Sequence, residues 1–322
     1  MVRLFARMGN PPMSARKLIL LSGFISLPVL YVAMYAIEVW TRREPIANTL
    51  KFEAMLVLIV MIALEQVYGY RNPVSQRFVL ARDIIATAVN KYVTAAALAF
   101  LVLPVLLFVP QHFLGRKVFL ASPGELGPFW LQVILIVLIV SFFRYWMHRW
   151  QHSNEFLWKL HSYHHRITDL RALNTEVSNP LDFALRNVLV FLILAVVGFD
   201  PLAIVLTVPA TNISGQISHW GADIKAGRTM NTIFVTPEVH RWHHSAKIPE
   251  GHKYSVNYGV EFAFWDILFG TYHLPQENGV AVQPERIGHP TGIADEPNYL
   301  KLLLAPFGLY PRSWNRVPEP AE

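Results

Sequence analysis

Nine of the thirteen histidines in this 322-residue chain fall between positions 148 and 244. Eight of these nine form three tight clusters, and His219 stands alone between the second and third clusters. The clusters read His148-Arg-Trp-Gln-His152, His161-Ser-Tyr-His164-His165 and His240-Arg-Trp-His243-His244. Imidazoles gathered away from water are unfavourable unless a cation binds them, and neutral imidazole is a common metal ligand. The clusters therefore predict a metal site.

The spacing inside each cluster is helical. Residues at positions i, i+3 and i+4 share one face of an α-helix. We expect His148 and His152 to share a face of a helix that continues from an apolar segment. We expect the second and third clusters each to present three imidazoles to a common centre. His219 directly follows another apolar stretch and can turn into the same site.

The number of imidazoles restricts the choice of metal. Eight or nine ligands exceed the four of one zinc site, so at least two ions are expected. The zinc-protease motif H-E-x-x-H is absent, because no histidine is followed by glutamate. Haem would need single histidines inside a helix bundle, and the apolar segments hold none away from their ends. Neutral nitrogen donors suit iron, and an iron pair with open positions can activate dioxygen for attack on C–H bonds.

The other four histidines, His112, His252, His273 and His289, have isolated positions. We expect each of them to be a surface or core residue that satisfies a hydrogen bond. The chain contains no cysteine, which excludes thiolate zinc sites, cysteine nucleophiles and an iron–sulfur cluster within this polypeptide. Neither a dinucleotide-binding glycine motif nor a P-loop is present.

The composition predicts a protein that is solvated by lipid. Hydrophobic residues make up 53% of the chain and charged residues 16%, and the mean hydropathy is +0.33. The net charge is +6. The basic residues lie mainly at the ends of apolar segments, so we interpret them as topology anchors and expect no nucleic-acid partner.

Four segments are long enough to cross a bilayer as helices. They are Leu18–Trp40, Phe52–Tyr70, Ile84–Val109 and Phe129–Met147. The excess of basic residues before the first segment and between the second and third places those regions in the cytoplasm. Four crossings then put both termini on the cytoplasmic side.

A fifth apolar stretch, Val188–Pro209, is interrupted by Gly198, Asp200 and Pro201. Each half is too short to span, so we expect a re-entrant or interfacial helical hairpin. The predicted fold is an all-α integral membrane protein with about four transmembrane helices, this hairpin and a cytoplasmic histidine-rich cap. The expected domains are a transmembrane region at 1–140, a catalytic domain at 141–275 and a C-terminal cytoplasmic extension at 276–322.

The order of the histidine clusters resembles that of the fatty acid hydroxylase superfamily, which includes sterol desaturases, alkylglycerol monooxygenase and bacterial ornithine-lipid hydroxylases. The segment from Thr236 to His244 is similar to the family's T-P-x-x-H-R-x-H-H. A later run, Asn257-Tyr258-Gly259, then Trp265-Asp266, then Phe269-Gly270-Thr271, is similar to its N-Y-G, W-D and F-G-T elements. The resemblance covers about residues 140–275.

This resemblance implies a set of metal ligands. They are His148, His152, His161, His164, His165, His219, His240, His243 and His244. It also implies two iron ions, dioxygen as co-substrate and a membrane lipid substrate. Electrons must come from a separate donor of the ferredoxin, cytochrome b5 or reductase type, because the chain has no cysteine and no complete cytochrome domain. The expected location is a bacterial inner membrane, or the endoplasmic reticulum in a eukaryote.

The reaction expected from this resemblance is hydroxylation of a lipid, with desaturation by the same centre as the alternative. Where sterol-acting members carry an arginine-histidine-proline stretch, this chain has Glu176-Val-Ser-Asn-Pro180. That departure favours acyl lipids or aminolipids, ornithine lipids among them, over sterols. Two further alternatives are a di-zinc membrane hydrolase and a metal transporter or sensor. The apolar segments carry almost no ionisable residues, which argues against transport.

Asp266 has two possible roles. It can orient a ligand imidazole, or it can cap a helix or form a salt bridge in the C-terminal region. The residues alone do not decide between these roles.

Overall fold

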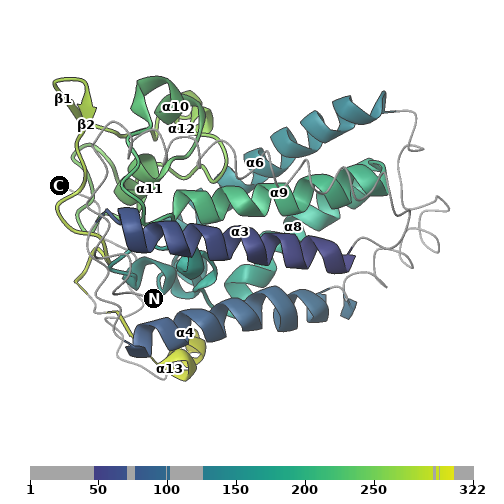
Figure 1. Ribbon diagram of the computed structural model, residues 1–322, viewed down its shortest axis with the longest axis horizontal. Coiled ribbons are helices and arrows are strands. Elements are labelled where there is room, and N and C mark those ends of the chain that lie inside the picture. Colours follow the sequence, from purple (N-terminus) through teal and green to yellow (C-terminus); the bar gives the residue numbers. More distant parts are fainter. Residues whose placement is uncertain are drawn as a thin grey trace.

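The computed structural model consists of long helices that run side by side, with shorter elements forming a cap at one end (Figure 1). It describes residues 47–70, 77–98, 100–101, 126–292, 295–296 and 298–307. The long helices are α3 (Ala47–Tyr68), α4 (Arg77–Ala88), α6 (Phe129–Ser153), α8 (Pro180–Val197) and α9 (Pro201–Ser218). Helix α4 continues directly into a π-helical turn, η1 (Val89–Thr94).

The cap is built from short elements that come from several parts of the chain. Its helices are α7 (Glu155–His161), η2 (His164–Arg166), η3 (Ala172–Glu176), α10 (Gly227–Ile233), α11 (Pro237–His243), α12 (Phe264–Leu268), α13 (Tyr299–Leu304) and η4 (Ala305–Phe307). Strands β1 (Gln276–Glu277) and β2 (Val280–Ala281) form an antiparallel hairpin in which Gln276 lies opposite Ala281. The described chain is therefore mostly helical, with this small sheet as a minor departure from the all-α prediction.

Helix α6 joins the long helices to the cap. Ile136 and Val140 on α6 pack against Val190 and Leu194 of α8 in one hydrophobic cluster. The helix passes beyond the predicted end of its apolar segment and stops before Asn154, whose backbone is extended. It therefore carries the first histidine cluster on its last turns, as the spacing predicted.

Helices α8 and α9 are longer than the sequence predicted. The expected break is confirmed, because Gly198 has a left-handed backbone (φ 83°) and the Asp200 side chain caps α9. Each helix has 18 residues and is about 27 Å long at 1.5 Å per residue, and the expectation that neither half spans a bilayer stays a prediction. Helix α9 continues beyond the apolar stretch to Ser218, whose hydroxyl donates to the Gly215 carbonyl of the same helix.

The four predicted crossings are supported to different extents. The first lies outside the described residues, the second corresponds to α3, and the third overlaps α4 and η1 before the described part of this segment ends at 101. The fourth corresponds to α6, and among the described residues this is the one helix long and apolar enough to cross a membrane. Only 28% of its most apolar window is buried, unlike the core helix of a soluble protein. The number of crossings, the orientation and the domain limits stay predictions.

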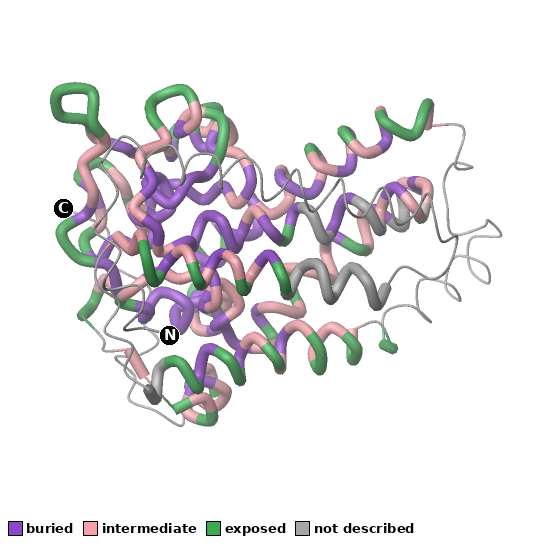
Figure 2. The backbone as a smooth tube through the Cα atoms, in the orientation of Figure 1, coloured by how far each residue is buried: buried purple, intermediate pink, exposed green. Residues whose placement is uncertain are grey.

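Buried residues concentrate at the end of the helices that adjoins the cap (Figure 2). On α4 and η1, by contrast, Ile84, Ile85, Tyr92 and Val93 are exposed although they are apolar or aromatic. The histidine clusters belong to the buried end.

Candidate metal centre

All nine predicted ligands are buried and come together in two groups. The five-histidine group consists of His148, His152, His161, His165 and His243. The four-histidine group consists of His164, His219, His240 and His244. Within each group, the ring nitrogens that could serve as ligands lie within 4.8 Å of one another. Each group therefore has the dimensions of a single metal site.

The second and third clusters are each divided between the two groups, so the expectation of one common centre per cluster is wrong. His161 closes α7, the chain turns, and His164 and His165 then lie on the 3-10 helix η2. These two neighbours point into different groups. On α11, His240 and the capping residue His244 lie in the four-histidine group, while His243 lies in the five-histidine group.

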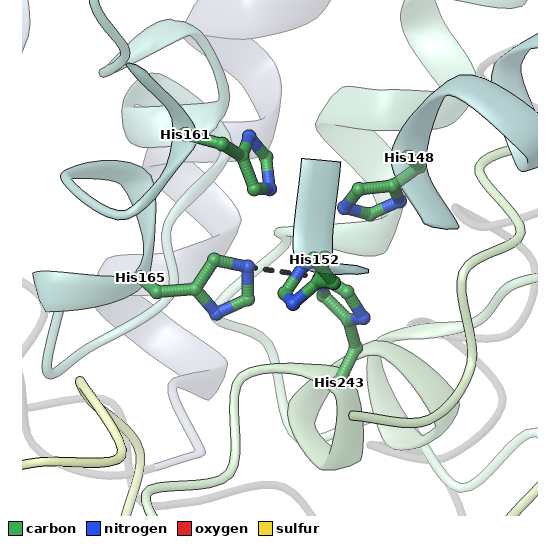
Figure 3. Close-up of side chains that lie close together, drawn as sticks. All are labelled: His148, His152, His161, His165 and His243. Carbon is green, nitrogen blue, oxygen red and sulfur yellow. Dashed lines mark hydrogen bonds between the residues drawn. The ribbon is translucent and has the colours of Figure 1, made fainter. Parts of the chain in front are cut away.

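The five-histidine group surrounds a small space between α6, α7, η2 and α11 (Figure 3). The Nε2 atoms of His165 and His243 lie 3.1 Å apart. Two ligands at about 2.1 Å from one ion and at right angles to each other are separated by about 3 Å. The spacing of this pair therefore fits two imidazoles on one metal ion.

The two groups are in direct contact. The rings of His165 and His244, one from each group, stack with their centroids 4.4 Å apart. The ring centroids of His164 and His244, both in the four-histidine group, are 4.8 Å apart. Two ions held by these groups would be neighbours, which is the arrangement of a dinuclear centre.

Backbone carbonyls orient several of the rings through their Nδ1 atoms. His148 Nδ1 lies 2.8 Å from the Tyr258 carbonyl oxygen, and His243 Nδ1 lies 2.8 Å from that of Val256. His164 Nδ1 lies 3.2 Å from the Val177 carbonyl oxygen. A carbonyl can only accept, so these contacts place the proton on Nδ1 and leave Nε2 free as a ligand.

Asp182 is a site residue that sequence reasoning missed. Its carboxylate is fully buried in the first turn of α8, where Oδ2 lies 3.4 Å from His161 Nδ1 and 3.3 Å from Arg186. Its other oxygen accepts a hydrogen bond from Gln151. Burial by itself raises the pKa of this carboxyl, but Arg186 and His161 outweigh it and hold the pKa below its ordinary value. The sequence feature that could have pointed to Asp182 is the Asn179-Pro180 helix start, which is followed two residues later by this aspartate.

Several buried ring nitrogens have no hydrogen-bond partner. Within the two groups these are both nitrogens of His152, His240 and His244, and Nε2 of His161; outside them, Nε2 of His289 is also unpaired. Buried polar atoms are nearly always paired, so unpaired nitrogens that face one another indicate a missing ligand. Nitrogen donors of this number and spacing fit two transition-metal ions.

Residues 133–271 match the model of the family described as fatty acid hydroxylase. This segment contains both histidine groups in full. The match supports the resemblance of this chain to the fatty acid hydroxylase superfamily.

Three curated proteins illustrate the relationship. The ornithine lipid hydroxylase OlsE of Rhizobium tropici is 36% identical over 149 residues, which are 46% of this chain and 44% of the relative. The Delta(7)-sterol 5(6)-desaturase ERG3A of Gibberella zeae is 25% identical over 74% of this chain and 67% of the relative. Sphinganine C4-monooxygenase 1 of Arabidopsis thaliana is 27% identical over 44% of this chain and 54% of the relative.

The chain thus spans about half the length of the first and third of these relatives. Their names are those of oxygenases and a desaturase, which agrees with the expectation of an oxidoreductase. No solved structure matches the chain at comparable significance.

The residues similar to the N-Y-G and W-D elements of the fatty acid hydroxylase superfamily form one hydrogen-bonded unit. Asp266 accepts hydrogen bonds from the backbone N–H groups of Tyr258 (2.6 Å) and Gly259 (2.8 Å) and from the hydroxyl of Thr271. The Tyr258 carbonyl in turn faces His148. Asp266 therefore caps a backbone turn and acts on the ligand indirectly. Burial raises the pKa of Asp266 to about 6.

Burial also keeps the predicted ligands in the cap neutral. It lowers the pKa of His164, His219, His240 and His244 well below the ordinary value, with neighbouring histidines adding to the effect. It lowers the pKa of His243 to about 3. Neutral imidazole is the form that binds metal, so these ligands need no deprotonation near neutral pH.

Three of the four isolated histidines are described, and they lie in neither group. His289 is buried, and its Nδ1 accepts from the hydroxyl of Thr291. His252 and His273 are partly exposed, with their rings 5.7 Å apart. The expectation that these residues are not ligands agrees with the geometry. His112 lies outside the described residues.

Proposed function

We propose that this protein is an O2-dependent hydroxylase of a membrane lipid that works through a histidine-bound pair of irons. The observation that carries the proposal is the division of nine buried imidazoles into two adjoining groups, each within 4.8 Å. Unpaired ring nitrogens in both groups support metal binding. Imidazole donors suit iron, and the names of the relatives favour oxidation over zinc-dependent hydrolysis.

In this proposal the nine histidines are the ligands, with the five-histidine group holding one ion and the four-histidine group the other. When bound, the two irons would supply the site at which dioxygen is activated for attack on a C–H bond. The chain provides neutral donors, fixed by carbonyls and by Asp182, in a space that excludes bulk water.

A lipid substrate is supported by where the ligands lie along the chain. His148 and His152 occupy the last turns of α6, whose preceding turns are the apolar candidate span. His219 caps the end of α9. Ions at the ends of long apolar helices would lie near headgroup depth, where a lipid can present its first carbons.

An aminolipid is the substrate class we favour, because ornithine lipid is what the name of the 36% identical relative specifies. The segment Glu176–Pro180, which departs from the sterol-type pattern, is part of the site. The Val177 carbonyl accepts from His164, and the carbonyls of Glu176 and Ser178 accept from Asn90. We propose that this segment shapes the substrate mouth, so that its departure from the sterol-type pattern disfavours sterols.

Desaturation is the second candidate, and the match to a sterol desaturase over 74% of the chain supports it. Both reactions begin by removing hydrogen from a C–H bond. They differ in whether oxygen is then transferred to carbon or a second hydrogen leaves. Either reaction needs electrons from a separate protein, because the sequence has no cysteine for an iron–sulfur cluster.

The test is turnover by the purified protein in nanodiscs that contain ornithine lipid, with a reductase system and isotope-labelled dioxygen. We expect label in a lipid product whose mass has increased by one oxygen atom. An unlabelled product with a new double bond would make the protein a desaturase. Cleavage of the lipid by a zinc-loaded protein, with no dependence on dioxygen, would refute the proposed oxidation.

Alanine variants test each half of the ligand set. We expect His164→Ala in the four-histidine group and His243→Ala in the five-histidine group each to abolish turnover and to lower the bound iron. His148, His161 and His240 should behave in the same way. His289→Ala is the matched control, since this histidine is also buried but lies outside both groups. Full activity in His164→Ala or His243→Ala protein would contradict the ligand assignment.

A further inference from the structure

The cap carries an exposed apolar surface on α10 and α12 that no described part of the chain covers. Ile267 and Leu268 are 49% and 65% exposed at the end of α12. Ile233 and Phe234, at the end of α10, are 41% and 38% exposed. The two helices are held together, since Ala263 N–H donates to the Ile233 carbonyl. We call these four exposed residues the cap patch.

A continuous chain of aromatic rings links the cap patch to α6. Successive ring centroids along it are 4.7 to 6.3 Å apart. In order, the rings are Phe234, Phe262, Phe264, Trp265, Phe269, Trp146 and Trp150. None of the seven is fully buried, and Trp150 is 51% exposed. The Trp265 indole N–H also donates to Ser141 of α6, 3.0 Å away.

The position of this aromatic chain suits the boundary between lipid and water. It meets α6 at Trp146 and Trp150, just beyond the apolar part of the candidate span. The Arg149 guanidinium lies 5.3 Å from the Trp146 ring, and Arg228 is exposed on α10 beside the cap patch. Half-exposed tryptophans next to arginines are typical of the headgroup layer, where indoles are anchored and cations meet phosphates.

We propose that the cap patch dips into the same bilayer that α6 crosses, so that α12 is an interfacial anchor of the cap. A bilayer is favoured as the occupant because the patch is continuous, through the aromatic chain, with the exposed apolar side chains of α6, such as Ile134 and Leu138. Figure 1 shows α10 and α12 beside the carboxyl end of α6, whereas β1 and β2 lie at the far edge of the cap.

This anchor connects the membrane surface with the ligands. Asp266, on the buried face of α12, holds the Tyr258 backbone N–H, and the Tyr258 carbonyl holds His148. The depth at which α12 rests in the headgroup layer therefore sets the depth of the five-histidine group. The anchor requires that the protein is embedded in a membrane, as proposed above, but it requires no particular substrate or metal.

The chain has no cysteine, so single cysteines can be introduced and spin-labelled without a background. We would label Leu268→Cys in the cap patch and Val280→Cys on β2, which is 55% exposed and apolar but distant from α6. A label at Ile134→Cys on α6 reports whether the span itself is in lipid. In full-length protein in nanodiscs, collision rates with dissolved oxygen and with a water-soluble nickel chelate are measured at each site.

We expect the oxygen-to-nickel ratio at 268 to approach the ratio at 134, while 280 gives the low ratio of a label in water. Equal ratios at 268 and 280, with a high ratio at 134, would overturn the anchor and leave the membrane protein intact. A low ratio at 134 would instead refute the membrane assignment itself. If the label at 268 is immobile and protected from both reagents, or shows spin–spin coupling, another protein segment or a second copy covers the patch. Either result would overturn the proposal.

Discussion

Asp182 links one metal ligand to two residues that are not ligands. Its carboxylate faces His161 Nδ1, and it also binds Gln151 of α6 and Arg186 of α8. A carboxylate behind a ligand histidine fixes the orientation of the ring and raises its basicity, and the loss of such a partner costs about 10- to 100-fold in metal affinity or activity. Asp182 is therefore a positioning residue.

We expect Asp182→Asn to lower the affinity of the five-histidine group for metal by about 10- to 100-fold while the protein still folds. The amide keeps the shape of the carboxylate but loses the charge that faces His161. Metal content after dialysis against graded chelator measures the effect. Asp169→Asn is the matched control, because it removes the charge of a partly exposed ion pair with Arg171 and not the carboxylate that faces His161. Equal metal retention by the two variants would show that Asp182 has no positioning role.

At the scale of elements, the end of α3 is hydrogen-bonded to the segment that follows His219. Glu65 Oε1 accepts hydrogen bonds from Gly221 N–H (2.9 Å) and from Ala172 N–H (2.7 Å) at the start of η3. The Trp220 indole N–H donates to the Met61 carbonyl. Gly221 is required here, because a Cβ would lie 2.7 Å from the Leu170 carbonyl oxygen. Helix α3 thus positions His219 although it contributes no ligand.

Replacing Glu65 by leucine should destabilise this connection, and replacing it by glutamine should not. Leucine leaves two buried N–H groups without an acceptor, at a cost of about 1–3 kcal/mol each, whereas the glutamine carbonyl oxygen can still accept from both. Unfolding temperature and metal content in detergent give the measurement. We expect Glu65→Leu to lower both and Glu65→Gln to preserve them. Unchanged stability in the leucine variant would contradict the proposed connection.

At the scale of the whole molecule, the buried histidines make the stability of the cap depend on bound metal and on pH. A metal that binds the folded chain more tightly than the unfolded chain stabilises the fold by mass action. Without metal, the unfolded chain binds more protons, because the pKa of His243 is about 3 when folded against 6.5 for the free side chain. The contribution of His243 to the free energy of unfolding of the metal-free protein is therefore largest above pH 6.5 and declines as the pH falls toward 3.

Two measurements check this prediction. We expect chelation at neutral pH to lower the unfolding temperature, and re-addition of metal to restore it. We expect the unfolding temperature of the metal-free protein to fall further between about pH 7 and about pH 5, as the unfolded state takes up protons. A metal-free protein with the same unfolding temperature at both pH values would contradict neutral, buried ligands.

The set of nine histidines that form the two groups could be predicted from the sequence because helical spacing is a local property. His148 and His152 share a face of α6 wherever that helix is placed, and His243 lies on a helix that starts at Thr236-Pro237. The break between α8 and α9 was equally local, because glycine, aspartate and proline determine it through backbone conformation and capping. The lengths of these helices were not, because polar residues outside the apolar stretch continue both helices and make long-range contacts such as that of Asp182 with Gln151.

Only the tertiary structure decided how the nine histidines are divided between the two groups. Neighbours such as His164 and His165 go to different groups because the chain turns after α7, so that the His164 ring meets His219 and the His165 ring meets His243. Asp182 and Glu65 could not be recognised for the same reason. A carboxylate becomes a partner of His161, or an acceptor for Gly221, only when folding brings together segments 21 and 156 residues apart. Local spacing therefore identified the candidate ligands, and long-range packing divided them into two groups.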